Sequence, residues 1–211
     1  MKQILISLSS AAVGCAMLTG CAAGGGFGGG VEMVDTKNDR GEAVVGIDYR
    51  DFDRAASEAV QSLLSSGAVQ NPNGGRYVMA VSRIINDTMQ RIDTDQLTKK
   101  IRVELLNSGK VVVTTAVGAN GAEDQMNYAV REGLRDNEEF NQARVQKKGT
   151  LQAPDISLSG KILQRNVKMS GGRQQIEYYF QLTLTDLSQG LAIWENELPI
   201  IKRASNSSVS W

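Results

Sequence analysis

A two-residue alternation near the C-terminus constrains the fold of this chain more than any other feature. Its apolar positions are Ile176, Tyr178, Phe180, Leu182 and Leu184, and its polar or amphipathic positions are Glu177, Tyr179, Gln181, Thr183 and Thr185. Side chains along a strand alternate between two faces, so this pattern predicts a strand with one buried and one wet face. Turn signals flank it at Gly171-Gly172 and Ser188-Gln189-Gly190. With apolar segments at 156–163 and 191–201, the C-terminal third predicts a three-stranded meander.

Two amphipathic helices are predicted upstream. The first is expected to have Asp51 as its N-cap and to stop at Gly67. Its apolar stripe is Phe52, Ala55, Ala56, Ala59, Val60, Leu63 and Leu64. The second is expected to begin near Asp93 or Thr94 and to end at Gly109, with Leu97, Ile101 and Leu105 on one face.

Two more strands are predicted between these features, at residues 77–85 and 111–113. In the first, Val78, Ala80 and Ile84 are expected to point inward, and the second is a β-branched run of three valines. Helices and strands of this kind predict one α/β domain, with a mixed or mainly antiparallel sheet and flanking helices. We expect this domain to span residues 47–204, followed by a short tail at 205–211.

The N-terminus predicts a lipoprotein signal. Lys2 precedes a short apolar run, and Leu18-Thr19-Gly20-Cys21 has the pattern of a bacterial lipobox. We therefore expect residues 1–20 to be a signal peptide, cleaved between Gly20 and Cys21, and Cys21 to carry the lipid. Ala22 follows the cysteine, and the absence of an aspartate there favours the outer membrane. Residues 21–46, rich in glycine from Gly24 to Gly30, are predicted to be a flexible tether.

Composition excludes several kinds of site. The chain contains no histidine, and its second cysteine, Cys15, lies within the signal. Zinc sites of the usual type and histidine-dependent catalysis are therefore not expected, and neither is a disulfide. Lysine and arginine balance aspartate and glutamate at 23 each, so no basic excess points to nucleic acid. We expect no enzyme activity, no metal and no cofactor.

The segment from Asn120 to Lys148 is charged and mixed in sign. Its first part predicts a helix bearing Met126, Ala129 and Val130, and its second part a short surface helix or loop. Gly118-Ala119-Asn120-Gly121 is interpreted as a structural turn, since it lacks the lysine and third glycine of a phosphate loop. The carboxylates Asp136, Glu138 and Glu139 are interpreted as solvated, and a hydrolase pair would also need aromatic residues that the chain lacks.

Several motifs, in order, resemble the LpoB family of outer-membrane lipoprotein activators of penicillin-binding proteins. They are Tyr49 and Phe52 before Leu63-Leu64 and Gly67, the strand leading into Asn86-Asp87-Thr88, the stretch Arg102 to Lys110 before the valines, the hairpin Phe180 to Gly190, and Ile193-Trp194-Glu195. The resemblance covers roughly residues 47–203 together with the lipobox. It implies a fold like the N-terminal domain of TolB and a partner that is a class A penicillin-binding protein.

The resemblance also implies that the chain acts by docking, and this directs attention to surface residues. The candidate partner contacts are Glu123, Asp124, Arg131 and Arg135 in the charged segment and Tyr179 on the wet face of its strand. Asn86 and Thr88 are interpreted as capping the end of their strand, with support of a docking surface as the alternative. The tether is shorter and richer in glycine than the proline-rich tether of the family. The alternative function is a structural lipoprotein of an envelope or curli-type secretion assembly.

Overall fold

The computed structural model describes residues 34–36, 38, 41, 44–118 and 121–208. The chain divides into two units, residues 1–39 and 40–211, and the fold below is that of the second. The predicted signal peptide, Gly20, Cys21 and Gly24–Gly30 lie outside the described residues, as does most of the predicted tether. The last three residues of the predicted tail also lie outside them.

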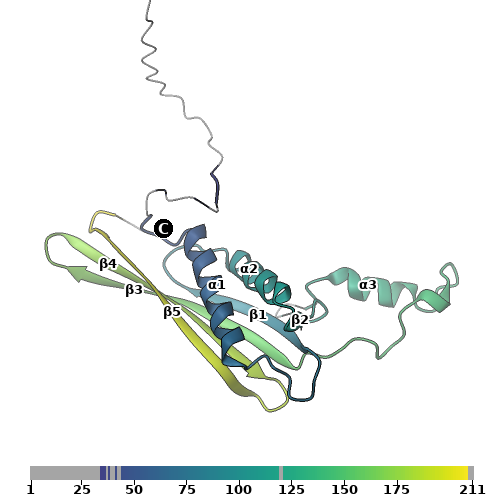
Figure 1. The fold of residues 1–211 in the computed structure, drawn as a ribbon. Helices are drawn as coiled ribbons and strands as arrows, with labels where there is room; N and C mark the ends of the chain where they lie inside the picture. The colour runs from purple at the N-terminus through teal and green to yellow at the C-terminus, as the bar shows by residue number, and fades with distance from the viewer. Residues whose placement is uncertain (1–33, 37, 39–40, 42–43, 119–120, 209–211) are drawn as a thin grey trace, which may run out of the picture. The chain divides into compact units, whose positions relative to one another are not determined.

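A five-stranded sheet forms one layer of the domain, in the order β2-β1-β3-β4-β5. The strands are β1 (Tyr77–Asp87), β2 (Val111–Val113), β3 (Ile156–Met169), β4 (Arg173–Asp186) and β5 (Leu191–Ser205). β1 pairs in parallel with β2 and β3, whereas β3, β4 and β5 are antiparallel neighbours (Figure 1). The predicted mixed sheet and three-stranded meander are therefore confirmed.

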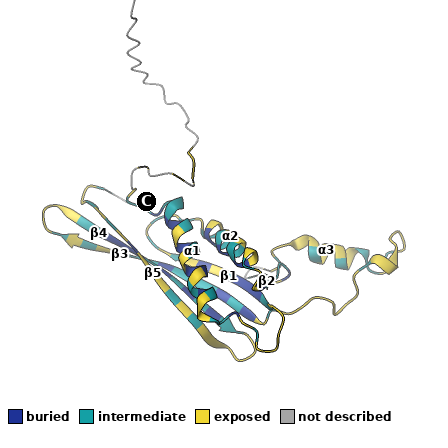
Figure 2. Ribbon diagram, viewed as in Figure 1, coloured by how far each residue is buried: buried dark blue, intermediate teal, exposed yellow. Residues whose placement is uncertain are grey.

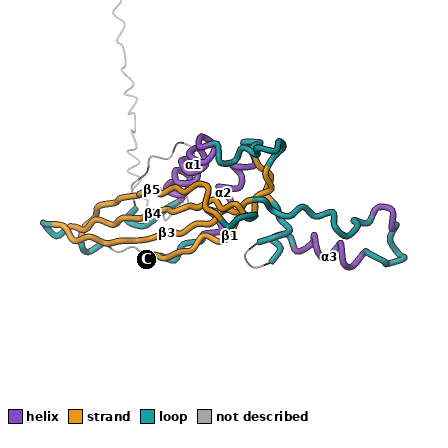
Figure 3. Tube along the Cα trace, turned by 90° about the horizontal axis from the view of Figure 1, so that it is seen from below, coloured by secondary structure: helices purple, strands orange, loops and turns teal. Residues whose placement is uncertain are grey.

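The long helices α1 (Tyr49–Ser66) and α2 (Thr94–Asn107) form the second layer, on one face of the sheet (Figure 3). A third helix, α3 (Gln125–Leu134), and a single 3₁₀ turn, η1 (Gln142–Arg144), lie beside the two layers. The predicted start of α2 is confirmed, because Asp93 caps it by accepting a hydrogen bond from the backbone N–H of Asp95. Among the described residues, no helix combines the length and the apolar character that crossing a bilayer requires.

The N-terminus of α1 corrects one prediction. Asp48, not Asp51, is the N-cap, and its Oδ1 accepts hydrogen bonds from the backbone N–H groups of Arg50 at 2.9 Å and Asp51 at 3.2 Å. Asp51 completes a capping box by accepting from the backbone N–H of Asp48 at 3.0 Å. Two aspartates three residues apart can both cap, and the sequence pattern does not separate the two roles. The predicted stop at Gly67 is confirmed by its left-handed φ of 79°.

The core lies between the helices and the sheet (Figure 2). The predicted stripe of α2 is buried, and so is that of α1 except for Leu64, which packs partly exposed against the core. The alternating apolar residues of β4 are buried beneath the helices, and the rings of Phe52 and Phe180 meet edge to face at 6.3 Å. Burial of such side chains contributes about 1.5–3 kcal/mol each. Trp194 is partly buried and packs against the margin of the core.

β1 departs from its predicted alternation. Met79, Val81 and Ile84 are buried on the helix side, whereas Val78 is only half-buried. Ala80 is buried, but its register partner is Ser157, so it lies on the opposite face from Met79. The register with β3 shifts between Val81 and Ile84, which marks a bulge. One extra residue changes the parity of the alternation, so a strict two-residue pattern fails there.

Two side chains fix the point where the chain enters the domain. The side-chain amide of Gln90 donates to the carbonyl of Ile47 at 3.0 Å and accepts from its N–H at 2.8 Å. Lys202 Nζ lies 2.5 Å from the carbonyl oxygen of Gly46 and 2.5 Å from Asp51 Oδ2. We call these contacts the entry clamp. They connect the segment before α1 to the loop after β1 and to the last strand.

Candidate docking surfaces

Four of the five predicted contact residues lie in α3 or directly beside one of its ends. Asp124 is the N-cap of this helix, and its side chain accepts from the backbone N–H of Met126 at 3.1 Å. The carboxylate of Glu123 forms an ion pair with the guanidinium of Arg102 on α2. Asp124 therefore starts the helix, whereas Glu123 connects this segment to the helical layer.

The two predicted arginines hold α3 to the segment that returns to the sheet. Arg131 donates to Asn127 Oδ1 at 2.9 Å and to Thr150 Oγ1 at 2.8 Å. Arg135 donates more weakly, to the carbonyl of Gln146 at 3.4 Å. These hydrogen bonds show that both arginines have a structural role, and their role as partner contacts stays a prediction.

No residue of α3 is buried within the described part of the chain. Met126, Tyr128 and Val130 are all exposed, Met126 at 64 %. The predicted helix is thus present, but it begins at Gln125 and its apolar side chains meet solvent instead of the core. Asp136, Glu138 and Glu139 are exposed too, as expected for solvated carboxylates.

Tyr179 lies on the sheet face opposite α1 and α2, which we call the outer face. Its hydroxyl donates to Glu177 at 2.9 Å, and the side-chain amide of Gln175 donates to the same carboxylate at 2.7 Å. Arg203 Nε in turn donates to Gln175 at 2.9 Å. The bonds from Gln175 and Tyr179 lower the pKa of Glu177, and donation to that carboxylate raises the pKa of Tyr179.

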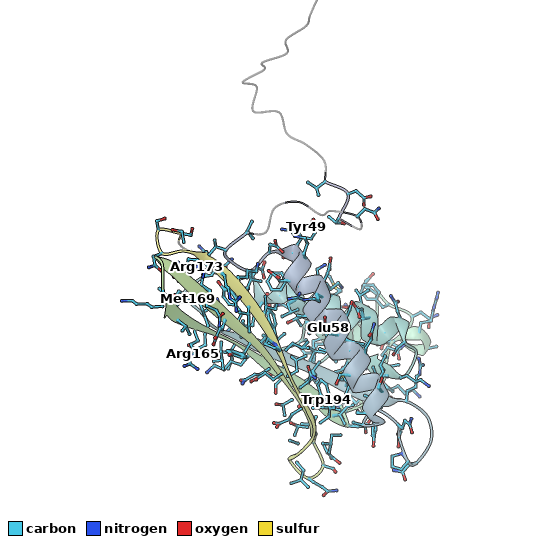
Figure 4. The ribbon with its side chains drawn as sticks, turned by 60° about the vertical axis from the view of Figure 1, so that its left-hand side comes forward. Tyr49, Glu58, Arg165, Met169, Arg173 and Trp194 are labelled. Carbon is cyan, nitrogen blue, oxygen red and sulfur yellow. The ribbon has the colours of Figure 1, made fainter. Side chains whose placement is uncertain are left out.

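The outer face is polarised along its strands. In Figure 4, Arg165, Met169 and Arg173 lie at the β3–β4 hairpin end, away from Trp194 near the other end of the sheet. Arg165 stands opposite Glu177 in the register of β3 and β4, and its charge also lowers the pKa of that carboxyl. Glu195 and Glu197 occupy the outer face near the other end, where they accept from Thr183 and Gln181. Arg165 and Arg173 therefore lie toward one end of the outer face, and Glu195 and Glu197 lie toward the other.

A cleft of about 410 Å³ lies between β1, α2 and the segment before α3, and we call it the edge cleft. Its charged side chains are Arg83, Asp95, Lys99, Arg102 and Glu123. The side chain of Arg102 is only 14 % exposed, and this burial lowers its pKa. The predicted site residues contribute Glu123 alone to this cleft.

Arg83, Lys99 and Arg102 were not among the predicted site residues. Lys99 and Arg102 are three residues apart on α2 and lie outside its buried stripe, so helical spacing predicts that their side chains share one surface. The position of Arg83 was not predictable from the sequence, because Arg83 lies in the bulge of β1. The structure does not gather the five predicted residues, since Tyr179 belongs to the outer face and the other four to the segment of α3.

Two predicted turns have structural roles. Asn86 donates to the carbonyl of Gln90 at 2.9 Å and accepts from Thr88, so this loop is held by its own side chains, as predicted. At the glycine turn the N–H of Gly121 donates to the carbonyl of Gly118 at 3.2 Å, and the two residues between lie outside the described part. No cluster of three or more potential metal ligands occurs among the described residues.

The fold defines a small mixed α/β domain with charged, open surfaces. Within that class, the chain belongs to the LpoB family: the model of "Peptidoglycan-synthase activator LpoB" matches residues 51–200. The family consists of regulatory activators of penicillin-binding proteins, not enzymes, and membership implies an envelope lipoprotein that acts in peptidoglycan synthesis. This confirms the resemblance inferred from the motifs.

Solved structures similar to this chain include the LpoB C-terminal domain from Escherichia coli, at 15 % identity and a TM-score of 0.42, covering 71 % of this chain and 98 % of that one. The NMR structure of E. coli LpoB is 13 % identical with a TM-score of 0.35, covering 97 % of this chain and 94 % of that one. The PelC dodecamer from Paraburkholderia phytofirmans is 16 % identical with a TM-score of 0.31, covering 62 % and 74 %. The search of curated proteins found no match.

Proposed function

We propose that this chain is an outer-membrane lipoprotein that binds a class A penicillin-binding protein and stimulates its synthesis of peptidoglycan. Membership of the LpoB family, over residues 51–200, carries the proposal. The lipobox at Leu18–Cys21 supports the anchor, and Ala22 supports the outer membrane as its site. Several acyl chains on one cysteine give stable attachment where a single chain would be marginal.

Stimulation by such a protein is a matter of differential binding. The domain raises the synthase's activity only if it binds the active conformation of that enzyme more tightly than the inactive one. Charged surfaces suit this role, because they set association rate and partner choice. The outer face with Tyr179 and the segment with Glu123, Asp124, Arg131 and Arg135 remain our candidate contact regions.

The tether sets a geometric condition on this function. A segment of about 30 residues reaches roughly 100 Å when fully extended. As a flexible coil it averages roughly 30 Å between its ends. Contact with an inner-membrane synthase therefore requires stretching of the tether or outward projection of the synthase.

The decisive experiment is a pull-down with the full chain in detergent from envelope extract, followed by a glycan-polymerisation assay with the retained synthase. We expect retention of a class A synthase and faster glycan polymerisation. Tyr179→Ala should weaken retention several-fold, whereas Thr183→Ala, on the same face of β4, should not. An extract that yields no synthase and no stimulation defeats the proposal, and a stable ring in size-exclusion would favour the secretion-assembly alternative.

The anchor is tested separately. A Cys21→Ala chain should leave the outer-membrane fraction while the domain keeps its far-ultraviolet circular dichroism spectrum. Persistent membrane association of this variant would contradict lipidation at Cys21.

A further inference from the structure

Part of β1 forms an open edge of the sheet. β2 pairs only with Tyr77–Met79, and the last bond on this side runs from the N–H of Thr114 to the carbonyl of Met79 at 2.9 Å. Backbone groups along a strand point alternately to its two edges, so those of Val81 point to the same side as the Met79 carbonyl. Within residues 44–118 and 121–208, no strand pairs with β1 on that side beyond Met79.

The edge cleft runs along this open edge, with Val81 and Arg83 on one wall and α2 on the other. Arg83 and Lys99 are exposed and form no ion pair or side-chain hydrogen bond with any described residue. Arg102 already holds Glu123, which leaves Asp95 as the unpaired acid of the cleft. Arg83 and Lys99 carry two positive charges and Asp95 carries one negative charge, so the unpaired side chains of the cleft have a net charge of +1. Both cations line the cleft beside the open edge.

We propose that the edge cleft binds an extended acidic segment of a protein partner, which adds as a strand beside Val81 and places carboxylates against Arg83 and Lys99. The open edge favours a peptide, because main-chain N–H and C=O groups satisfy a free strand edge. The two unpaired cations favour acidic side chains, since guanidinium and ammonium groups form their stronger hydrogen bonds with carboxylates. The identity of the partner rests on the proposed function: the segment belongs to the synthase.

The same charges oppose pairing of this edge with a second copy of this chain. Charged side chains on an edge strand discourage edge-to-edge association, because two copies would bring like charges together. Arg83 and Lys99 would meet their counterparts in such a pairing. An acidic segment has the opposite sign, so the cleft is selective for a different sequence.

Direct binding is measured with the full chain and a fluorescein-labelled peptide, acetyl-Val-Glu-Val-Asp-Val-amide, by fluorescence anisotropy. The matched control peptide replaces Glu with Gln and Asp with Asn. We expect saturable binding of the acidic peptide, weakened by added salt, and at least about fivefold weaker binding of the neutral one. Equal binding of the two peptides, or no saturable binding, overturns the proposal.

Variants locate the site. Arg83→Ala and Lys99→Ala should each weaken peptide binding about two- to fivefold, the range expected for an exposed charge pair. Lys110→Ala, an exposed cation outside the cleft, should leave it unchanged. Equal losses in all three variants would show that net charge, not the cleft, holds the peptide, and would overturn the proposal. Thermal unfolding of each variant verifies that the fold is intact.

The synthase assay separates this inference from the proposed function. If the wild-type chain stimulates a synthase, Arg83→Glu with Lys99→Glu should reduce its apparent affinity about tenfold or more, and Lys110→Glu should not. Full stimulation by the double variant at wild-type concentrations overturns the cleft proposal while the proposed function stands. A wild-type chain that stimulates no synthase defeats the proposed function, and the cleft is then judged on peptide binding.

Discussion

The contact between Lys202 and Asp51 offers the sharpest test of how the domain is held together. It joins the last strand to the first turn of α1, and the side chains of Lys202 and Asp51 are only 15 % and 11 % exposed. Lys202→Met removes the charge and keeps most of the apolar stem. The variant leaves Asp51 without its cation and the Gly46 carbonyl without its donor.

Removing one member of a buried ion pair costs about 3–5 kcal/mol, because the remaining charge stays desolvated and unpaired. Some solvent reaches both side chains here, so we expect a loss nearer about 2–4 kcal/mol. For a domain of this size, about 2–4 °C in Tm accompanies each kcal/mol. Lys202→Met should therefore lower Tm by roughly 4–16 °C.

The assay is urea unfolding of the full chain, followed by circular dichroism, for Lys202→Met, Asp51→Asn and the double variant. Asp51→Asn retains an oxygen for the capping bond from Asp48 and removes the buried charge. We expect the double variant to be destabilised by at least about 1 kcal/mol less than the sum of the single changes. Lys168→Met, at an exposed position of β3, is the control. A Lys202→Met loss below about 0.5 kcal/mol, or strict additivity, would refute the reasoning.

Two further predictions concern packing and titration. Gly160→Ala should destabilise the domain by about 1–3 kcal/mol, because its Cβ would come within 2.5 Å of Leu182 Cδ2, whereas Gly133→Ala meets no atom within 4 Å and should not lower Tm. Tyr179→Phe should raise the pKa of Glu177 toward its ordinary value, measured by carbon-13 NMR of the carboxyl, because a donor to the charged form is lost. Since that pKa is depressed in the folded state, Glu177 stabilises the fold above its unfolded pKa and loses this effect as pH falls through the folded pKa. Glu177→Gln should therefore reduce the difference between the free energies of unfolding at neutral and at acidic pH. An unchanged difference in urea unfolding would contradict a stabilising role for the hydrogen bonds from Gln175 and Tyr179 to Glu177.

The regular parts of the fold were predictable because local spacing determines them. The alternation in β4 and the stripe of α2 place the same residues in the core that the structure buries. The predictions were wrong where one residue shifts the alternation of a strand or the position of a helix cap. The bulge after Val81 changed the inward face of β1, and Asp48 took the capping role expected of Asp51.

The candidate site was less predictable, since it depends on contacts between distant segments. Tyr179 was placed correctly opposite Phe180 by alternation, but its bond to Glu177 depends on side-chain reach. The edge cleft depends on how early β2 ends relative to β1, and a run of three valines does not reveal which neighbours remain unpaired. Charged residues read as solvated surface can therefore belong to a concave site that only the tertiary arrangement creates.

The entry clamp has a mechanical consequence for the N-terminal attachment that we propose. A pull on the chain before Gly41 first reaches Arg50 of α1, which donates to the Gly41 carbonyl at 2.7 Å, and then reaches Gln90 and Lys202. Lys202 belongs to β5, which is hydrogen-bonded to β4 along almost its whole length. The load is thus shared with the β4–β5 ladder, which has as many register pairs as the β3–β4 ladder. In the function that we propose, the entry clamp would keep the docking surfaces intact when the anchor and the partner pull on the domain from opposite sides.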